Sequence, residues 1–398
     1  MKNMLIAQSG GPSMVINQSL VGAVKAARES YKKEIGKIYG AKHGIDGVLK
    51  EDFIDLKKVP MKVLETIAST PSSALGSVRR KPNEEDCAKI FEVLKKHGIG
   101  FFFYIGGNDS AETAHIIDTM ARKAKFPLKC FHIPKTIDND LMGNDHTPGY
   151  GSAARFVAMA FLGDNLDNLA LGGVKINVVM GRHAGFLTAA SALARRAPDD
   201  GPHLIYLPER PFSMEKFAAD VKAVMTKFGR CVVAVSEGVC DAKGEPIAAT
   251  LAGAAEKDSH GNVQLSGTGA LGDLLAAEIK TRLGIKRVRA DTFGYLQRSF
   301  PNSVSDIDAA TAFGAGVAAV QAAVELDDVD SGSVAICRKN NKKETEIYLQ
   351  IIPLKTVAKN TRAMPAAFIA KSGNDVTSAF IEYAAPLVGE LTQTARLI

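Results

Sequence analysis

The stretch GFFFYIGGNDSAETAHIIDTMARKAKFPLKCFHIPKTIDND, residues 100–140, decides the fold class of this protein. An apolar run ends at Gly106 and Gly107, a helix-length amphipathic segment follows, and a second apolar run ends at Pro134. This order predicts two parallel strands joined by a crossover helix. Because ligands of open α/β sheets bind beyond the carboxyl ends of the strands, the polar residues after each run are candidates for a functional site.

The same alternation continues on both sides of this stretch. An apolar run leads into Gly10 and Gly11, and a helix-length segment follows. We predict an α/β fold with two lobes, each a largely parallel sheet flanked by helices, and with the active site in the cleft between them. A hairpin is predicted for residues 331–354, with Asn340 and Asn341 near its turn. The α/β prediction also rests on the alternation of strand-like and helix-like segments at 4–9, 15–29, 35–41, 152–171, 175–181, 203–208 and 231–238.

The composition is that of an ordinary globular protein. A length of 398 residues predicts two or three domains, and 46% hydrophobic with 23% charged residues allow a core in each. The net charge of +6 is modest, and no RNA-module or zinc-finger spacing is present, so we expect no nucleic acid partner. No early apolar run of about 18 residues occurs, so we expect a cytoplasmic protein without membrane association. The five cysteines contain no CxxC pair, and we interpret them as buried thiols.

Two glycine turns are candidates for phosphate binding. In QSGGPSMVIN, residues 8–17, Gly10 and Gly11 precede a helix whose free N–H groups can bind an anion. The turn lacks both GxGxxG and the Walker lysine, so neither a dinucleotide site nor a P-loop is indicated. In YIGGNDSAETA, residues 104–114, the polar residues after Gly107 either cap the helix or hold a metal ion.

The loop after Pro134 contains the groups that phosphoryl transfer requires. It places Lys135, Thr136, Asp138 and Asp140 within six residues. Phosphoryl transfer needs a cation against the developing charge, a carboxylate that accepts the hydroxyl proton, and often a second carboxylate near a metal ion. The loop alone leaves open a second interpretation, a polar turn with aspartate caps.

Together, these motifs resemble those of the phosphofructokinase family. The match runs in order from residue 9 to residue 306, so it does not rest on a single tetrapeptide. Four segments resemble the phosphate, donor, metal and catalytic loops, and three resemble the sugar-phosphate segments. They are SGGPSMVIN (9–17), LGSVRRKP (75–82), GGNDS (106–110), PKTIDND (134–140), MGRHAGFLTAASALA (180–194), AVSEGVCD (234–241) and GYLQRSFPNSVSD (294–306).

The resemblance implies a role for residues of both lobes. Asp138 resembles the general base that takes the proton of the sugar C1 hydroxyl, with Lys135, Thr136 and Asp109 as the other catalytic residues. Arg289 resembles an arginine that reaches the sugar phosphate from a neighbouring subunit. The implied donor-binding residues are Gly10, Gly11, Arg79, Gly107 and Asn108. The implied substrate-binding residues are Thr136, Ile137, Asp138, Asp140, Met180, Gly181, Arg182, Glu237, Arg289, Tyr295, Leu296, Gln297 and Arg298, with Tyr295 standing where the family usually has histidine.

Two positions indicate the phosphoryl donor. ATP-dependent relatives resemble GGDGS and PGTIDND at these loops, whereas this chain has Asp109 and Lys135 in place of two glycines. Both departures are similar to the pyrophosphate-dependent branch. The Asp109 carboxylate would occupy the space and charge of a nucleotide α-phosphate, and Lys135 could neutralise the pyrophosphate leaving group. Asn108 stands where the family commonly has a metal-binding aspartate, so Mg²⁺ would be held through the amide oxygen, through water or mainly by pyrophosphate.

The resemblance therefore implies a reversible, magnesium-dependent transfer from pyrophosphate to fructose 6-phosphate, usable in glycolysis and gluconeogenesis. We predict a donor-binding and catalytic lobe over 1–149, a sugar-phosphate lobe over 150–296, and a return segment over 297–398 that completes both lobes and ends in a C-terminal extension. A homodimer or homotetramer with a shared site is expected. The alternatives are an ATP-dependent sugar-phosphate kinase of the same family and a non-catalytic phosphometabolite sensor.

Overall fold

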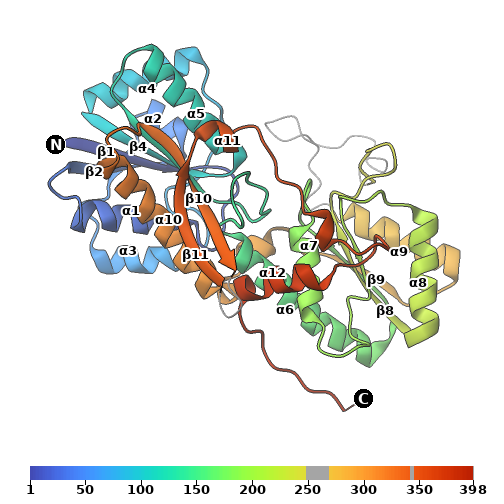
Figure 1. Ribbon diagram of the computed structural model, residues 1–398. Helices are drawn as coiled ribbons and strands as arrows, with labels where there is room; N and C mark the ends of the chain where they lie inside the picture. The colour runs from blue at the N-terminus through green and yellow to red at the C-terminus, as the bar shows by residue number, and fades with distance from the viewer. Residues whose placement is uncertain (248–268, 341–344, 398) are drawn as a thin grey trace. The chain divides into compact units, whose positions relative to one another are not determined.

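The predicted strand, helix and strand of residues 100–140 are present as β4 (Ile99–Gly106), α5 (Asn108–Lys123) and β5 (Lys129–Pro134). β4 and β5 are parallel neighbours, and every residue of β4 is buried. The computed structural model describes residues 1–247, 269–340 and 345–397 (Figure 1). The predicted α/β class, with two helix-flanked and largely parallel sheets, is confirmed.

The chain divides into two units, and each is discontinuous in sequence. Unit 1 comprises Met1–Tyr150 with Arg298–Arg362, and unit 2 comprises Gly151–Gln297 with Ala363–Ile398. The chain therefore passes from one unit to the other after Tyr150, after Gln297 and after Arg362.

Unit 1 contains a seven-stranded sheet with the order β11-β10-β5-β4-β1-β2-β3. Its inner strands are parallel, whereas the edge strands β3 and β11 run antiparallel to their neighbours. The predicted hairpin is confirmed as the pair β10 and β11, and Asn341, expected near its turn, lies outside the described residues. The remaining strands are β1 (Lys2–Gln8), β2 (Ile35–Ala41), β3 (Phe53–Asp55), β10 (Ser331–Asn340) and β11 (Thr345–Ile352).

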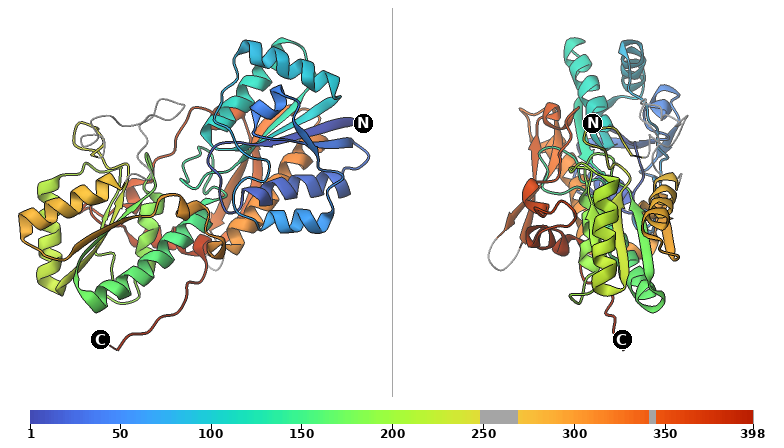
Figure 2. Two further views of the ribbon diagram at one scale, coloured as in Figure 1. Left: turned by 180° about the vertical axis from the view of Figure 1, so that it is seen from behind. Right: turned by 90° about the vertical axis from the view of Figure 1, so that its right-hand side faces the viewer.

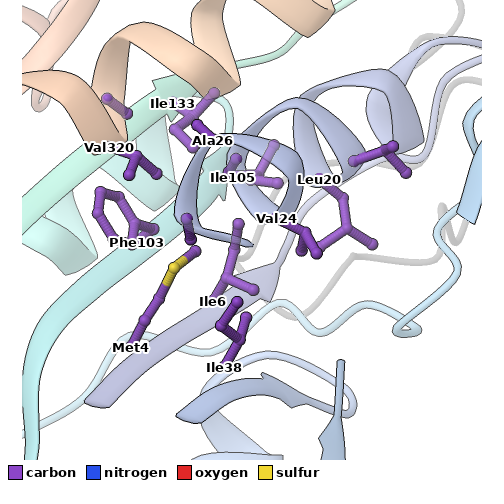
Figure 3. Close-up of a cluster of buried hydrophobic side chains, with 14 of the residues drawn as sticks. Met4, Ile6, Leu20, Val24, Ala26, Ile38, Phe103, Ile105, Ile133 and Val320 are labelled. Carbon is purple, nitrogen blue, oxygen red and sulfur yellow. The ribbon is translucent and has the colours of Figure 1, made fainter. Parts of the chain in front are cut away.

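Helices cover both faces of this sheet. On one face, Leu20 and Val24 of α1 pack with Val320 of α10 over Ile6 and Phe103 of the strands (Figure 3). Helix α10 is long and apolar enough to cross a membrane, but half of its apolar window is buried in this core. The helices of unit 1 are α1 (Ile16–Glu29), α2 (Ile45–Leu49), α3 (Met61–Ala68), α4 (Glu84–Lys96), α5, α10 (Asp306–Glu325) and α11 (Leu354–Val357), with a 3₁₀ turn η3 (Pro301–Ser303).

Two glycines permit the close packing of α1 against α10. A Cβ atom on Gly22 would lie 2.2 Å from the Phe313 carbonyl oxygen, and one on Gly316 would lie 2.1 Å from the Ser19 carbonyl oxygen. Any side chain at either position would force the two helices apart. This contact joins the first helix of the chain to a helix some 290 residues later, so the return segment is part of the core of unit 1.

Unit 2 contains a four-stranded parallel sheet with the order β7-β8-β6-β9. Its core is formed by strand residues such as Ile176 and Val233 with helix residues such as Phe217, Leu275 and Ile279. Figure 2 shows the helices beside these strands from behind. The elements are α6 (Tyr150–Leu171), β6 (Gly173–Val179), α7 (Phe186–Ala190), η1 (Ser191–Ala194), β7 (Leu204–Tyr206), α8 (Met214–Phe228), β8 (Arg230–Ser236), α9 (Ala270–Leu283), β9 (Val288–Thr292), η2 (Gly294–Arg298), η4 (Ala366–Phe368) and α12 (Ser378–Val388).

The cysteines form no disulfide. Cys87, Cys130, Cys231 and Cys337 are buried, and Cys240 is partly exposed. The prediction of buried thiols is thus confirmed for four of the five, and burial raises the pKa of Cys87 to about 11. Such thiols are protonated and unreactive at neutral pH.

Candidate functional site

The polar loops of unit 1 follow β1, β4 and β5, which are adjacent strands of one sheet. Because the three strands are parallel, their carboxyl ends lie at the same edge, as the sequence predicts. Gly10, with a φ of 74°, turns the chain after β1. Its N–H donates to the Val78 carbonyl oxygen at 3.3 Å, and the Ser77 hydroxyl donates to its carbonyl oxygen at 2.6 Å. These bonds bring the basic segment containing Arg79 to the glycine turn.

The guanidinium of Arg298 lies against Gly11. A Cβ atom on Gly11 would approach Arg298 Nη1 to 2.6 Å, so the lack of a side chain at Gly11 leaves room for the guanidinium in this position. Arg298 is the first residue of the returning segment of unit 1, whereas its neighbour Gln297 belongs to unit 2. The structure therefore places Arg298 beside the predicted phosphate loop at Gly11, although the resemblance implies a role in sugar-phosphate binding.

Lys135 follows β5 and points its amino group to the same turn. Its side chain is 3% exposed, and Nζ donates a hydrogen bond to the Gly11 carbonyl oxygen. Burial, together with the charge of Arg298, lowers the pKa of Lys135 to about 8, against the opposing effect of Asp138. The amine is thus still a cation at neutral pH. A cation here can stabilise negative charge on a phosphate at the turn.

Residues 135–147, which we name the base loop, present the two predicted carboxylates. The Thr136 hydroxyl accepts a hydrogen bond from the Asp138 N–H at 3.1 Å and lies 3.5 Å from Asp138 Oδ2. Thr136 and Ile137 are buried, whereas Asp138 is half-buried. This turn fixes the Asp138 backbone, and the Asp138 side chain remains partly exposed.

Asn108 and Asp140 lie together at the start of α5. Asn108 Nδ2 donates to Asp140 Oδ2 at 3.3 Å. Asn108 Oδ1 is buried and has no hydrogen-bond partner among the described residues. Burial and the like charge of Asp138 raise the pKa of Asp140. An amide oxygen without a partner beside a carboxylate fits a hard cation that keeps most of its ligands as water or phosphate.

Asp109 is held by a lysine that sequence reasoning did not single out. Lys81 Nζ lies 3.0 Å from Asp109 Oδ1 and 2.7 Å from Glu112 Oε2. Glu112 also pairs with Lys359 at 3.5 Å. The network keeps the partly exposed Asp109 carboxylate in place at the first turn of α5 and balances its charge. Only the position of Lys81 in the predicted basic donor loop, LGSVRRKP, pointed to it.

In unit 2, the three predicted sugar-phosphate segments meet at the carboxyl ends of β6, β8 and β9. The Met180 N–H donates to the Gln297 side-chain oxygen at 3.2 Å, and the Gly181 N–H lies 3.4 Å from Glu237 Oε1. Gln297 and Glu237 are buried, and Arg182 is half-buried. Hydrogen bonds therefore join segments that are more than 50 residues apart in sequence.

Three other predicted residues of unit 2 are exposed. Arg289 lies on the edge strand β9, and its Nη1 donates a hydrogen bond to the neighbouring Val288 carbonyl oxygen at 3.0 Å. Tyr295 and Leu296 have exposed fractions of 45% and 59%.

Arg362 is the second residue that sequence reasoning missed. Its side chain donates hydrogen bonds to carbonyl oxygens of the base loop, including that of Asn139 at 2.8 Å. It is 224 residues away from Asp138 in a segment without a motif, so no sequence signal pointed to it.

Among the described residues, no group of three or more His, Cys, Asp or Glu side chains is arranged to hold a metal ion.

The sequence and the fold of this chain are similar to those of known proteins. The profile of the family described as Phosphofructokinase matches residues 3–323. A pyrophosphate–fructose 6-phosphate 1-phosphotransferase of Rhodospirillum rubrum is 57% identical over 385 residues, covering 97% of this chain and 94% of that protein. A protein of the same description from Xanthomonas campestris pv. campestris is 40% identical, covering 97% and 91%. The crystal structure of a pyrophosphate-dependent phosphofructokinase from Nitrosospira multiformis has a TM-score of 0.87 at 34% identity, covering 100% of this chain and 94% of that one.

Proposed function

The chain belongs to the phosphofructokinase family, and on that premise we propose that it is a pyrophosphate-dependent 6-phosphofructokinase. It transfers a phosphoryl group from pyrophosphate to the C1 hydroxyl of fructose 6-phosphate and forms fructose 1,6-bisphosphate and phosphate. Pyrophosphate and the product ester have similar transfer potentials, so the reaction is reversible and serves glycolysis and gluconeogenesis. A cytoplasmic location is part of the proposal.

One observation carries the assignment of the donor. The buried Lys135 ammonium contacts the glycine turn at Gly11. At the position of Lys135, the loop of ATP-dependent members resembles PGTIDND and has glycine. A buried cation is energetically costly unless it has an anionic ligand, and a pyrophosphate bound without a nucleoside supplies one. The donor then binds along Gly10 and Gly11, with Arg79 and Gly107 as further ligands and Arg298 beside the turn.

Asp138 acts as the general base of the transfer. It takes the proton of the C1 hydroxyl as the oxygen bonds to the transferred phosphorus atom and the bridging P–O bond of pyrophosphate breaks. The bridging electron pair leaves with the departing phosphate, whose charge Lys135 and Arg298 stabilise. Thr136 holds the Asp138 backbone through the 3.1 Å bond from the Asp138 N–H. In the reverse direction, Asp138 returns the proton to the C1 oxygen.

Asp109 excludes ATP from the donor site. Its carboxylate would occupy the space of a nucleotide α-phosphate, and Lys81 keeps it in that place. Because the Lys81 ammonium balances much of the carboxylate charge, occupied space contributes more to the exclusion than charge repulsion.

The residues present fit a magnesium ion, and we include Mg²⁺ in the proposal. Asn108 would bind it through the buried amide oxygen that has no partner among the described residues, with Asp140 as a neighbouring carboxylate. When bound, the ion neutralises charge on the phosphate oxygens. Magnesium commonly binds one or two protein groups and completes its shell with water and substrate phosphates, which agrees with so few protein ligands here.

Unit 2 supplies the ligands of fructose 6-phosphate. Glu237 is placed by the Gly181 N–H to accept hydrogen bonds from sugar hydroxyls, and Met180 and Arg182 belong to the same loop. Tyr295, Leu296 and Gln297 lie in η2. We further propose a homodimer or homotetramer in which Arg289 of one subunit reaches the sugar phosphate bound by another.

Transfer of isotopic label tests this function against both alternatives. Purified protein with Mg²⁺, fructose 6-phosphate and ³²P-labelled pyrophosphate should produce label at C1 of fructose 1,6-bisphosphate. An ATP-dependent kinase would produce this label only from γ-labelled ATP. A phosphometabolite sensor would bind the labelled compound and transfer nothing.

A further inference from the structure

The base loop receives a set of hydrogen bonds from Arg362. Arg362 Nε and Nη2 donate to the Asn139 carbonyl oxygen at 3.2 and 2.8 Å. Nη1 donates to the carbonyl oxygens of Asn144 and Asp145, the latter at 2.8 Å. The Arg362 N–H donates to the Asp140 carbonyl oxygen at 2.7 Å. One residue therefore contacts four carbonyl groups on both arms of the loop.

The rest of the loop shows why this residue matters. At one end, Thr136 pairs with Gly149 in a parallel bridge. On the other arm, Asn144 Oδ1 accepts a hydrogen bond from the Ile336 N–H of β10 at 2.9 Å. Between these fixed points lies Asn139, which is flanked by the two carboxylates of the loop. Thr136 is thus held by its bridge to Gly149 and Asn144 by strand β10, whereas Asn139 between them depends on other contacts.

Asn139 turns the chain in the middle of the base loop. Its φ is 60°, in the left-handed region, which asparagine adopts more readily than most residues other than glycine. Its side-chain oxygen accepts from the Thr147 N–H at 3.0 Å, and its carbonyl oxygen accepts two bonds from Arg362. The direction of the Asn139 peptide determines where the side chains of Asp138 and Asp140 project.

We propose that Arg362 is a positioning residue that orients the Asp138 carboxylate by holding the Asn139 peptide and the opposite arm of the base loop. The proposal rests on the proposed function, because it assigns Arg362 a part in that reaction. Arg362 acts on the general base through the backbone carbonyl oxygens of the loop. It raises turnover by keeping the general base in line with the C1 hydroxyl, where a misplacement of about 1 Å can cost roughly 10²-fold in rate.

A guanidinium can hold both arms of the loop, whereas a lysine ammonium cannot. Its five N–H donors lie in one rigid plane and can serve carbonyl oxygens in different directions at once. A lysine ammonium on a flexible stem would satisfy one side of the loop and release the other. Arg362→Lys is therefore a mild substitution for folding and a severe one for the orientation of the loop.

Kinetics of Arg362→Lys and Arg362→Ala test the proposal. The matched control is Arg195→Lys in unit 2, because Arg195 also donates two guanidinium bonds to a carbonyl oxygen, that of Pro202, and pairs with Asp375 at 3.0 Å. We expect the Arg362 variants to lose roughly 10- to 100-fold in kcat, while KM for pyrophosphate changes less than about 3-fold. Arg195→Lys should lower thermal stability to a similar degree and keep kcat within about 3-fold of the wild type.

Hydrogen–deuterium exchange measures the same effect without activity. The peptide spanning the base loop should exchange faster in both Arg362 variants, and peptides of β4 and α5 should be unchanged. This measurement tests the effect of Arg362 on the loop independently of the proposed function. If exchange is faster in the variants but the protein transfers no phosphate, only the proposed function is refuted. Should Arg362→Ala fail to fold, Arg362→Lys decides the matter. Wild-type kcat in that variant, or equal losses in kcat and in affinity for pyrophosphate, would overturn the positioning role.

Discussion

Replacing Lys135 by methionine should make the protein more stable and much less active. The Lys135 amine has an ordinary pKa of 10.5, and burial lowers it to about 8 in the folded protein. At pH 7 the amine is protonated in both states, so the folded state bears the whole cost of the buried charge. The difference between the two pKa values corresponds to about 3 kcal/mol.

The structure reduces the net gain. Methionine fills a similar volume but cannot donate to the Gly11 carbonyl oxygen, and an acceptor left unsatisfied costs about 1–3 kcal/mol. We therefore expect a net stabilisation of about 1 kcal/mol at pH 7, which corresponds to a rise of about 2–4 °C in the unfolding temperature of a unit of this size. Wild-type stability relative to the variant should improve between pH 8 and 10.5, because the folded state loses its proton first and the cost disappears.

Activity should change in the opposite direction. Loss of the Lys135 cation should lower kcat with pyrophosphate roughly 10²- to 10³-fold, the usual effect of removing one group that stabilises transition-state charge. Wild-type kcat/KM for pyrophosphate, which reports pKa values of the ligand-free enzyme, should fall as pH rises above about 8, and this alkaline limb should be absent from the variant. Arg298, Asp138, Arg79 and Asp140 are the charged groups that act on this amine, and they remain unchanged.

Differential scanning calorimetry at pH 7 and pH 10 and steady-state kinetics over pH 6–10 provide the measurements. A lower unfolding temperature at pH 7 would show that Lys135 stabilises the fold. A kcat near that of the wild type would refute its role toward the leaving group.

Four further substitutions test other parts of the site. Asp138→Asn should lower turnover by roughly 10²-fold or more with little change in unfolding temperature or substrate affinity, because the amide is nearly isosteric but accepts no proton; near wild-type turnover would exclude the general-base role. Arg289→Ala should raise KM for fructose 6-phosphate more than KM for pyrophosphate, and Tyr295→Phe should have the same effect to a smaller degree. The reason is that a charge-assisted hydrogen bond contributes roughly 1.5–3 kcal/mol and a neutral one about 1 kcal/mol. A selective rise of KM for pyrophosphate would place both residues on the donor side. Asp109→Gly should create measurable turnover with ATP and reduce turnover with pyrophosphate, and the absence of ATP turnover would mean that other residues also exclude the nucleotide.

The sequence predicted those strands and turns that have a local sequence pattern of their own. Buried parallel strands appear as continuous apolar runs, so β4, β5 and β8 were visible, and the glycine turns after β1 and β4 marked their carboxyl ends. The hairpin of β10 and β11 was predicted for another reason, the turn residues Asn340 and Asn341 between two strand-like segments.

Contacts between distant segments could not be predicted. The pairing of Gly22 in α1 with α10 depends on the distance between two helix backbones, which no local pattern reveals. Lys81 and Arg362 act through side-chain contacts across 28 and more than 200 residues, and a lysine or arginine in a loop is usually solvated. The position of Arg298 beside Gly11 likewise follows from the return of the chain to unit 1, not from its own motif.

The choice of phosphoryl donor is tested most directly by competition. The unmodified protein should be given equal concentrations of pyrophosphate and ATP with Mg²⁺ and fructose 6-phosphate, each donor carrying a different phosphorus isotope at the transferred group. We predict that essentially all label at C1 of fructose 1,6-bisphosphate comes from pyrophosphate, and that omission of ATP changes neither rate nor yield. Label that derives mainly from ATP, with little turnover when pyrophosphate is the sole donor, would contradict the roles assigned to Lys135 and Asp109.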